Sequence, residues 1–361
     1  MDLYSSSESS DSDPAHSVKT LDYSYLMLSS QTLVTKLTDL EDNHSRDEKP
    51  ESVQTLFLYN NQLIELPKKV GIFHNLRHID ISNNRLKSLP DFMTHFPLTS
   101  LNAKNNIISN ESLPKSFLPW SGTLRKLNLG GNNLGHFPMQ CLELSNLKYL
   151  YLGSNEIEEI PRNINKITGL SILCVGGNRL IDVPDTVGKL EDLEVLIVSD
   201  NRLESLPASI ANLKKLKTLQ LHKNRLRTLP TEIVALSSGI NAELSLRDNP
   251  LVVKFVNDMT YNPASLLEIS ARSIKIHNVN YSRSELPQCL SDYLASAHHC
   301  LNPKCNGVFF DNRVEHIKFV DFCGKYRVPL LQYLCSSKCV IDNSVLQSQA
   351  DYGRMRKVLL G

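Results

Sequence analysis

The sequence predicts an α/β fold: a solenoid of about nine stacked coils, bent into a horseshoe and followed by a small α+β module rich in cysteine. Three observations predict this class. A leucine-rich phrase recurs across residues 51–256, its period is 23 residues over most of that range, and six of the eight cysteines crowd between positions 289 and 339. One such coil cannot bury its own apolar face, so the coils form a fold only by stacking on one another.

Composition narrows the classes of function. The 39 basic and 38 acidic residues nearly cancel, so no overall charge points to nucleic acid or to a membrane surface. Residues 1–17, which begin MDLYSSSESSDSDP, are serine-rich and acidic and are predicted to be a disordered tail. They lack the basic and apolar regions of a secretory signal, and no stretch is apolar enough to span a bilayer. We therefore expect a cytoplasmic or nuclear protein without a nucleic-acid or membrane partner.

Residues 18–50 are predicted to form an N-terminal cap and a loop. They carry the apolar sequence LDYSYLML, and a charged stretch, EDNHSRDEKPES, extends from position 41 to position 52. A solenoid needs caps because its end coils would otherwise expose their cores to water.

The central region, residues 51–256, is predicted to be leucine-rich repeats. Phrases such as LYLGSNEIEEIP and LIVSDNRLESLP place an asparagine at positions 132, 155, 178, 201 and 224, each 23 residues after the last. Asn61 and Asn84 keep this interval, whereas the repeats around Asn106 and Asn249 are irregular. The leucines are expected to point inward from a short parallel strand, and the asparagine to bridge the backbones of neighbouring coils. A proline closes each phrase, as in the 23-residue subclass of intracellular signalling repeats.

Repeats of this kind present a concave strand surface, and its middle coils are predicted to bind a target protein. The outward positions there are apolar and lie beside glycines 130, 131, 153, 176 and 177, while His222 and Arg247 form a polar rim. Contiguous exposed apolar surface usually marks an interface; the alternative is that these residues merely suit strands. The predicted apolar positions are Tyr149, Tyr151, Ile172, Cys174, Val195 and Ile197.

Residues 257–296 are predicted to contain two short helices. The first, PASLLEISARSIK, begins at Pro263 and places Leu266, Ser270 and Ile274 on one face. It resembles a BC-box, which docks in a hydrophobic groove of elongin C; the BC-box pattern prefers cysteine where this chain has Ser270. The alternative is a helix that only caps the solenoid.

The second helix lies in ELPQCLSDYL, where Leu286, Pro287, Leu290 and Leu294 have the spacing of a cullin box. Proline suits the first position of a helix, and Leu290 and Leu294 then share a face. Cullin-5 boxes typically carry a second proline at the position of Cys289, so cullin-2 is favoured and cullin-5 stays open.

Residues 297–345 are predicted to be a zinc module, and residues 346–361 a tail. Cys300 and Cys305 form one close pair, and Cys335 and Cys339 another. Paired thiolates on two tight loops suit a tetrahedral structural zinc ion, which would leave no open position for catalysis. His298, His299 and Cys323 are spare candidate ligands, and the alternative is a set of reduced, buried thiols.

Taken together, the repeats, SLLEISARSI, LPQCLSDYL and HHCLNPKC…CSSKC resemble the leucine-rich repeat-containing protein 58 family. The resemblance implies a substrate-recognition subunit of an elongin B/C–cullin RING ubiquitin ligase, with no catalytic residue of its own. The partners it implies are elongin C and elongin B, cullin-2 or cullin-5 with its RING protein, and a protein substrate. The main alternative is a signalling scaffold without ligase association. No zinc-hydrolase helix, nucleophile elbow or phosphate-binding glycine loop favours an enzyme.

Overall fold

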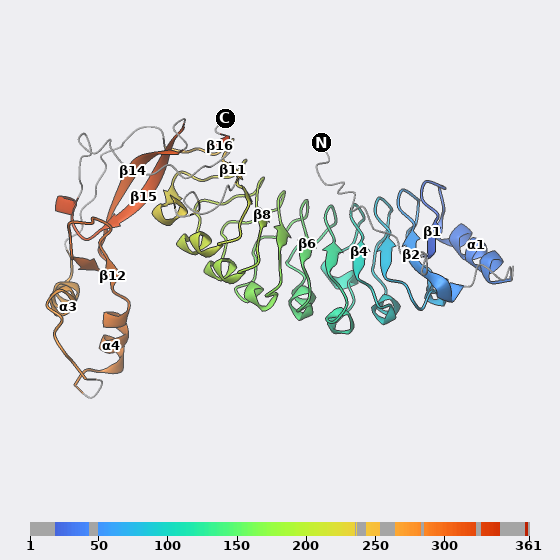
Figure 1. Ribbon diagram of the computed structural model, residues 1–361, viewed down its shortest axis with the longest axis horizontal. Helices are drawn as coiled ribbons and strands as arrows, with labels where there is room; N and C mark the ends of the chain where they lie inside the picture. Colours follow the sequence, from blue (N-terminus) through green and yellow to red (C-terminus); the bar gives the residue numbers. More distant parts are fainter. Residues whose placement is uncertain are drawn as a thin grey trace, which may run out of the picture. The chain divides into compact units, whose positions relative to one another are not determined.

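The computed structural model describes residues 19–42, 50–234, 236, 243–252, 264–282, 285–322, 326–339 and 358–359. The chain divides into two compact units, residues 1–156 and 157–361 (Figure 1). The predicted tail at 1–17, most of the tail at 346–361, residues 43–49 of the charged loop, Pro263 and Cys323 lie outside the described residues. Within the described part of the chain, no helix is both long and apolar enough to cross a bilayer.

The first unit is a run of repeats behind a helical cap. Helix α1 (Ser30–Asp42) buries Leu33 and Leu37, and strand β1 pairs in parallel with β2. At the centre of each three-residue repeat strand a leucine or isoleucine is buried while its two neighbours are partly or fully exposed, which is the two-residue period of a strand. The strands, in spatial order, are β1 (Lys19–Asp22), β2 (Val53–Phe57), β3 (His78–Asp80), β4 (Ser100–Asn102), β5 (Lys126–Asn128) and β6 (Tyr149–Tyr151).

The second unit continues the same pattern in its repeats. Its parallel strands, in spatial order, are β7 (Ile172–Cys174), β8 (Val195–Ile197), β9 (Thr218–Gln220), β11 (Glu243–Ser245) and β16 (Val358–Leu359). Strand β10 (Leu229–Pro230) lies outside this sheet and pairs instead with the C-terminal module.

Short 3₁₀ helices return the chain between strands. Five of them follow a phrase-ending proline in extended conformation, such as Pro184 with φ −67° and ψ 147°, because proline is compatible with a helix start but not with its interior. In the first unit they are Pro50–Ser52, Lys68–Ile72, Asp91–His95, Asn110–Ser112, Leu118–Trp120 and Met139–Glu143. In the second unit they are Ile164–Lys166, Asp185–Lys189, Ala208–Asn212, Thr231–Val234 and Ser337–Cys339.

The asparagine ladder confirms the predicted repeat class. In the second unit, Asn201 accepts a hydrogen bond from the Leu180 amide at 3.0 Å and donates to the carbonyls of Val175 and Val198, both at 3.1 Å. Buried backbone groups that no strand pairs are satisfied in this way. The same pattern of bonds recurs at the other ladder positions, namely Asn61, Asn84, Asn106, Asn132, Asn155, Asn178, Asn224 and Asn249.

The residue before each ladder asparagine has positive φ, including Gly131 at 64° and Gly177 at 67°. Glycine adopts this conformation without steric strain. The structure therefore gives these two glycines a role in the backbone turn before the ladder asparagine.

The irregular repeat after Asn106 accommodates the only tryptophan of the chain. The side chain of Trp120 is fully buried against Phe117, and its ring nitrogen donates to the Phe96 carbonyl at 3.2 Å. The longer spacing thus holds a bulky core residue with its polar atom satisfied.

The C-terminal module of the second unit is α+β, as predicted. It comprises α3 (Leu266–Ile276), α4 (Gln288–Ala295), β12 (His298–His299), β13 (Val308–Phe309), β14 (Val314–Phe322) and β15 (Tyr326–Leu334). Strands β14 and β15 form an antiparallel hairpin, and β15 also pairs in parallel with β10 of the last repeats. A small core of Ala271, Leu294, Val308 and Phe310 joins the two helices to β13.

Candidate functional site

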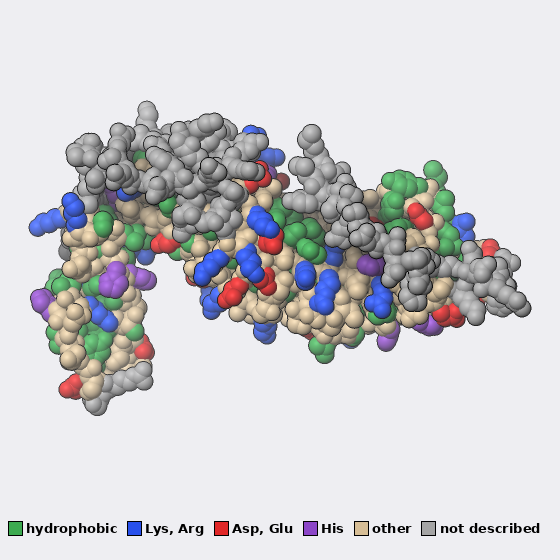
Figure 2. All heavy atoms as spheres, in the orientation of Figure 1, with side chains coloured by type: hydrophobic (Ala, Val, Ile, Leu, Met, Phe, Trp, Pro, Cys, Tyr) green, Lys and Arg blue, Asp and Glu red, His purple; other side chains and the backbone are tan. Residues whose placement is uncertain are grey.

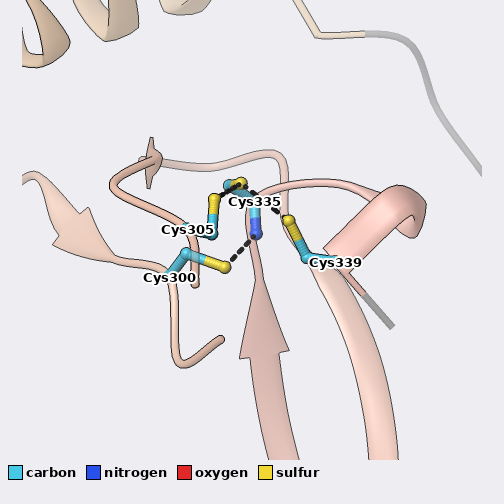
Figure 3. A group of neighbouring side chains, drawn as sticks. All are labelled: Cys300, Cys305, Cys335 and Cys339. Atoms are coloured by element: carbon cyan, nitrogen blue, oxygen red, sulfur yellow. Dashed lines mark hydrogen bonds between the residues drawn. The ribbon is translucent and has the colours of Figure 1, made fainter. Parts of the chain in front are cut away.

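Four cysteine sulfurs converge at one corner of the C-terminal module (Figure 3). They belong to Cys300, Cys305, Cys335 and Cys339, the four residues that the sequence analysis singled out, and all four Sγ atoms lie within 4.8 Å of one another. The Sγ atom of Cys335 is 3.6 Å from that of Cys305 and 3.5 Å from that of Cys339. A tetrahedron with zinc–sulfur bonds of about 2.3 Å has edges of about 3.8 Å, so the four residues fit a metal of this size.

Two chain reversals bring the thiols together. Cys300 follows β12, and Cys305 lies in the turn before β13; Cys335 follows β15, and Cys339 ends the 3₁₀ helix that comes next. The Asn302 side chain joins the two loops by donating to the carbonyl of Cys339 at 3.0 Å. A hydrogen bond thus fastens the loop of the first cysteine pair to that of the second.

Gly307 is a site residue that the sequence analysis missed. Its amide donates to the Sγ atom of Cys305 at 3.2 Å, and an added Cβ would lie only 2.6 Å from the Sγ atom of Cys335. No other residue fits there without displacing a sulfur. A glycine two residues after a candidate ligand was the available signal, since glycine often marks close approach of the backbone.

The pKa values of three of the four thiols are shifted in different directions. Burial raises the pKa of the Cys305 and Cys335 thiols. At Cys339 burial also disfavours the thiolate, but hydrogen bonds from the Ser336 hydroxyl and from three neighbouring thiols outweigh it and lower the pKa. Of these three thiols, Cys339 is the one whose surroundings favour the thiolate, and a bound cation would favour the thiolate form of each ligand.

Helix α3 turns an apolar face outward. Leu266 is 83% exposed, and Ile269 and Leu267 are 52% and 50% exposed, so hydrophobic side chains show at the surface of this region in Figure 2. Ser270 is exposed on the same face, whereas Ile274 is partly buried against the module core. Of the predicted three residues, the structure leaves Leu266 and Ser270 free to meet a partner, and Ile269 joins them as a residue that the prediction omitted.

The helix starts differ from those predicted. Helix α3 begins at Leu266, and Ser265 is its N-cap, whose side chain accepts from the Glu268 amide at 3.2 Å. The prediction began this helix at Pro263. Pro287 occupies the N-cap of α4 instead of the first helical position, since its ψ of 147° is extended.

Two of the predicted cullin-box side chains serve the module itself. Leu294 is 3% exposed and lies in the core, and Leu286 packs against that core. Both therefore help to hold α4 in place, and their predicted contact with a cullin stays a prediction. Pro287 is exposed and Leu290 is half-buried, so these two remain accessible.

The predicted concave residues fall in both units. Tyr149 and Tyr151 flank the buried Leu150 in the first unit. In the second unit, Ile172 and Cys174 flank Leu173, and Val195 and Ile197 flank Leu196, while His222 is half-buried and Arg247 is exposed. All six apolar side chains are partly exposed, as an outward strand position requires. The spare metal candidates His298 and His299 are exposed on β12 and do not belong to the four-cysteine cluster.

Comparison with known proteins identifies close relatives. The chain is similar to leucine-rich repeat-containing protein 58 of Xenopus tropicalis, at 51% identity over 327 residues that cover 87% of this chain and 92% of the relative. The protein of the same name from Homo sapiens is 57% identical over 321 residues, covering 88% of this chain and 85% of the relative. Both matches extend far beyond any single repeat.

Family profiles and a solved structure agree on the repeats. The profile described as "Leucine rich repeat" matches residues 122–180 and 168–226, and "Leucine Rich repeats (2 copies)" matches residues 51–92. A leucine-rich repeat protein of Leptospira interrogans superimposes with a TM-score of 0.53 at 30% identity, covering 57% of this chain and 51% of that protein. The fold is therefore that of a repeat protein that presents surfaces to partners.

Proposed function

This chain belongs to the leucine-rich repeat-containing protein 58 family, and we propose that it serves as the substrate-recognition subunit of an elongin B/C–cullin RING ubiquitin ligase. It has no catalytic residue in this role. Its contribution is proximity: holding a target near the conjugating enzyme raises the effective concentration of the target lysines. The role places the protein in the cytoplasm or nucleus, where the thiols of the C-terminal module stay reduced.

The observation that carries the proposal is the outward apolar face of α3. An 83% exposed leucine beside a half-exposed isoleucine, with the small Ser270 on the same face, is what a groove-binding helix offers. A helix that only capped the solenoid would bury these side chains and expose its charged ones. The face is therefore assigned to elongin C, with Leu266 as the anchor and Ser270 where the groove requires a small side chain.

For the proposed cullin contact, the accessible residues of the predicted cullin box are Pro287 and Leu290. Leu286 and Leu294 pack toward the module core and hold α4 in place. Cullin-2 is favoured because the exposed Cys289 stands where a cullin-5 box carries proline. Binding assays with each cullin separate the two.

For the four-cysteine cluster, the proposed occupant is a structural zinc ion. Four sulfurs at tetrahedral spacing match its preferred donor set. Zinc would join the β12–β13 turn to the end of β15 and stabilise the module that carries α3. With four thiolate ligands it has no open position, so its contribution is structural.

In each unit the proposed target surface is the outward side of the repeat strands. Its apolar residues are Ile172, Cys174, Val195 and Ile197 in the second unit, and Tyr149 and Tyr151 in the first. His222 and Arg247 add polar contacts in the second unit.

Charged substitutions test this surface. Val195→Asp with Ile197→Asp should leave the coil folded, because the buried Leu196 between them is unchanged, while a lost interface anchor costs about 2 kcal/mol or more of binding free energy. Proximity labelling in cells treated with a proteasome inhibitor should then lose the ligase-dependent proteins but keep elongin C. Ile181→Asp is the matched control, since Ile181 is an exposed isoleucine outside the strand. If the double variant labels the same proteins as the wild type, recognition lies elsewhere on the chain.

Co-purification of elongin B and C with the full chain tests the proposal as a whole. Recovery of both supports the receptor role. Their absence, with the repeats folded, would leave the signalling scaffold as the better account.

A further inference from the structure

Helix α3 departs from the usual arrangement of a surface helix, because it buries an acidic side chain and exposes apolar ones. Most surface helices bury an apolar stripe and expose their charges, but α3 buries Glu268, which is 2% exposed, and half-buries Arg272, while Leu266 and Ile269 face outward. Rolling the helix about its axis would bury both apolar side chains, which the hydrophobic effect favours. Ala271 and Ile274 pack the inner face against the module core, so the feature of that face that needs a specific explanation is the buried Glu268.

Glu268 has a complete set of partners for a buried carboxylate. Its Oε2 atom accepts from the Asn312 amide at 2.9 Å, and its Oε1 atom accepts from the Phe310 amide at 3.2 Å. Oε1 also accepts from the Nε and Nη2 atoms of Arg272, at 3.0 and 2.5 Å. Two of these donors are backbone groups just after β13, so the carboxylate fastens α3 to that segment in one rotational position.

Arg272 links Glu268 to the cysteine cluster through hydrogen bonds. Its Nη1 atom donates to the carbonyl of Cys335 at 2.9 Å, and its Nη2 atom donates to the carbonyl of Asn312. Cys335 contributes one of the four converging sulfurs. A single guanidinium thus links the inner face of α3, the segment after β13 and a residue of the candidate metal site.

We infer that Glu268 and Arg272 form an orientation lock, which keeps the apolar face of α3 outward and makes that orientation depend on the order of the four-cysteine site. A rolled helix would carry the carboxylate and the guanidinium out to water, but it would leave the amides of Phe310 and Asn312 and the carbonyls of Asn312 and Cys335 without these partners. Backbone groups that lose their partners are costly to bury. The importance of the lock for elongin binding rests on the proposed function, but the lock itself does not.

The primary test is hydrogen exchange of the α3 amides in the full-length, zinc-loaded chain. Arg272→Met keeps most of the side-chain length and removes every donor. Exchange across residues 269–277 should become at least tenfold faster while the repeats and the zinc content remain unchanged. Arg313→Met, which removes an exposed arginine from the same module, should leave α3 as it is. Wild-type exchange in Arg272→Met would overturn the lock.

Two further arms identify how the lock acts. The swapped variant Glu268→Arg with Arg272→Glu keeps a pair of opposite charges but points each at the wrong backbone partners. Its α3 amides should therefore exchange as fast as those of Arg272→Met, and a return to wild-type exchange would overturn the proposal.

Zinc removal by a chelator should speed α3 exchange in the wild type and add little in Arg272→Met. An equal response in both proteins would show that Arg272 does not transmit the order of the site. If Arg272→Met loses its zinc, Arg272→Lys replaces it, because lysine keeps the charge but cannot span both carbonyls.

Elongin binding is the third readout. Arg272→Met should bind elongin B–C at least tenfold more weakly than Arg313→Met. If the wild type binds no elongin, the proposed function fails, and the exchange measurements still decide the lock.

Discussion

Cys300→Ser is expected to remove zinc from the chain and to loosen the C-terminal module. The wild-type protein, purified without chelators, should contain one zinc per chain by elemental analysis, and the variant close to none. The effect should be large because structural zinc sites contribute about 10–16 kcal/mol of apparent binding free energy at neutral pH, and this free energy is coupled to folding. The β12–β13 turn and the end of β15 would then lose the metal that joins them.

Cys289→Ser is the matched control, since Cys289 is exposed on α4 and lies outside the cluster. It should keep the full zinc content. Zinc-free wild-type protein would leave the reduced-thiol interpretation of the four cysteines standing.

Leu266→Ala with Ile269→Ala is expected to weaken binding to elongin B–C by about 30- to 1,000-fold, which corresponds to about 2–4 kcal/mol for truncated interface anchors. Both side chains are largely exposed in the free chain, so the melting temperature should hardly change. Calorimetric titration of elongin B–C into the full-length variant gives the affinity directly. Ile274 is left intact because it packs against the module core, and its truncation would combine a folding defect with a binding defect.

Leu301→Ala provides the comparison, because Leu301 is an exposed leucine of the same module but does not lie on α3. It should bind like the wild type. Normal binding by the α3 double variant would instead show that this helix is not the elongin site.

Much of the fold follows from local pattern. Nine asparagines mark nine coils because each satisfies backbone groups of its own and an adjacent coil, a requirement that recurs with every turn. The convergence of the four cysteines was also predictable, since paired thiols in short loops separated by strands are typical of a structural metal site.

What the sequence could not predict depends on contacts between distant segments. The outer face of α3 was guessed from Leu266, Ser270 and Ile274, but the inner face is set by Glu268, which binds amides more than forty residues away. Leu294 was predicted as a cullin-box residue and is buried in the module core, a position that spacing alone could not predict because it does not tell which side of a short helix meets its own domain. Amphipathic periodicity shows that a helix has two different faces, but it does not tell which face packs against the helix's own domain and which is left for a partner.

The most direct test of the receptor role is assembly from purified components. The full-length, zinc-loaded chain is mixed with elongin B–C and then with cullin-2 or cullin-5, each carrying its RING protein, and the mass of the complex is measured by size-exclusion chromatography with light scattering. The account predicts a stable complex with one copy of each component, formed with cullin-2 in preference to cullin-5 and lost in the Leu266→Ala, Ile269→Ala variant. A wild-type chain that elutes alone, folded and with its zinc bound, would contradict it.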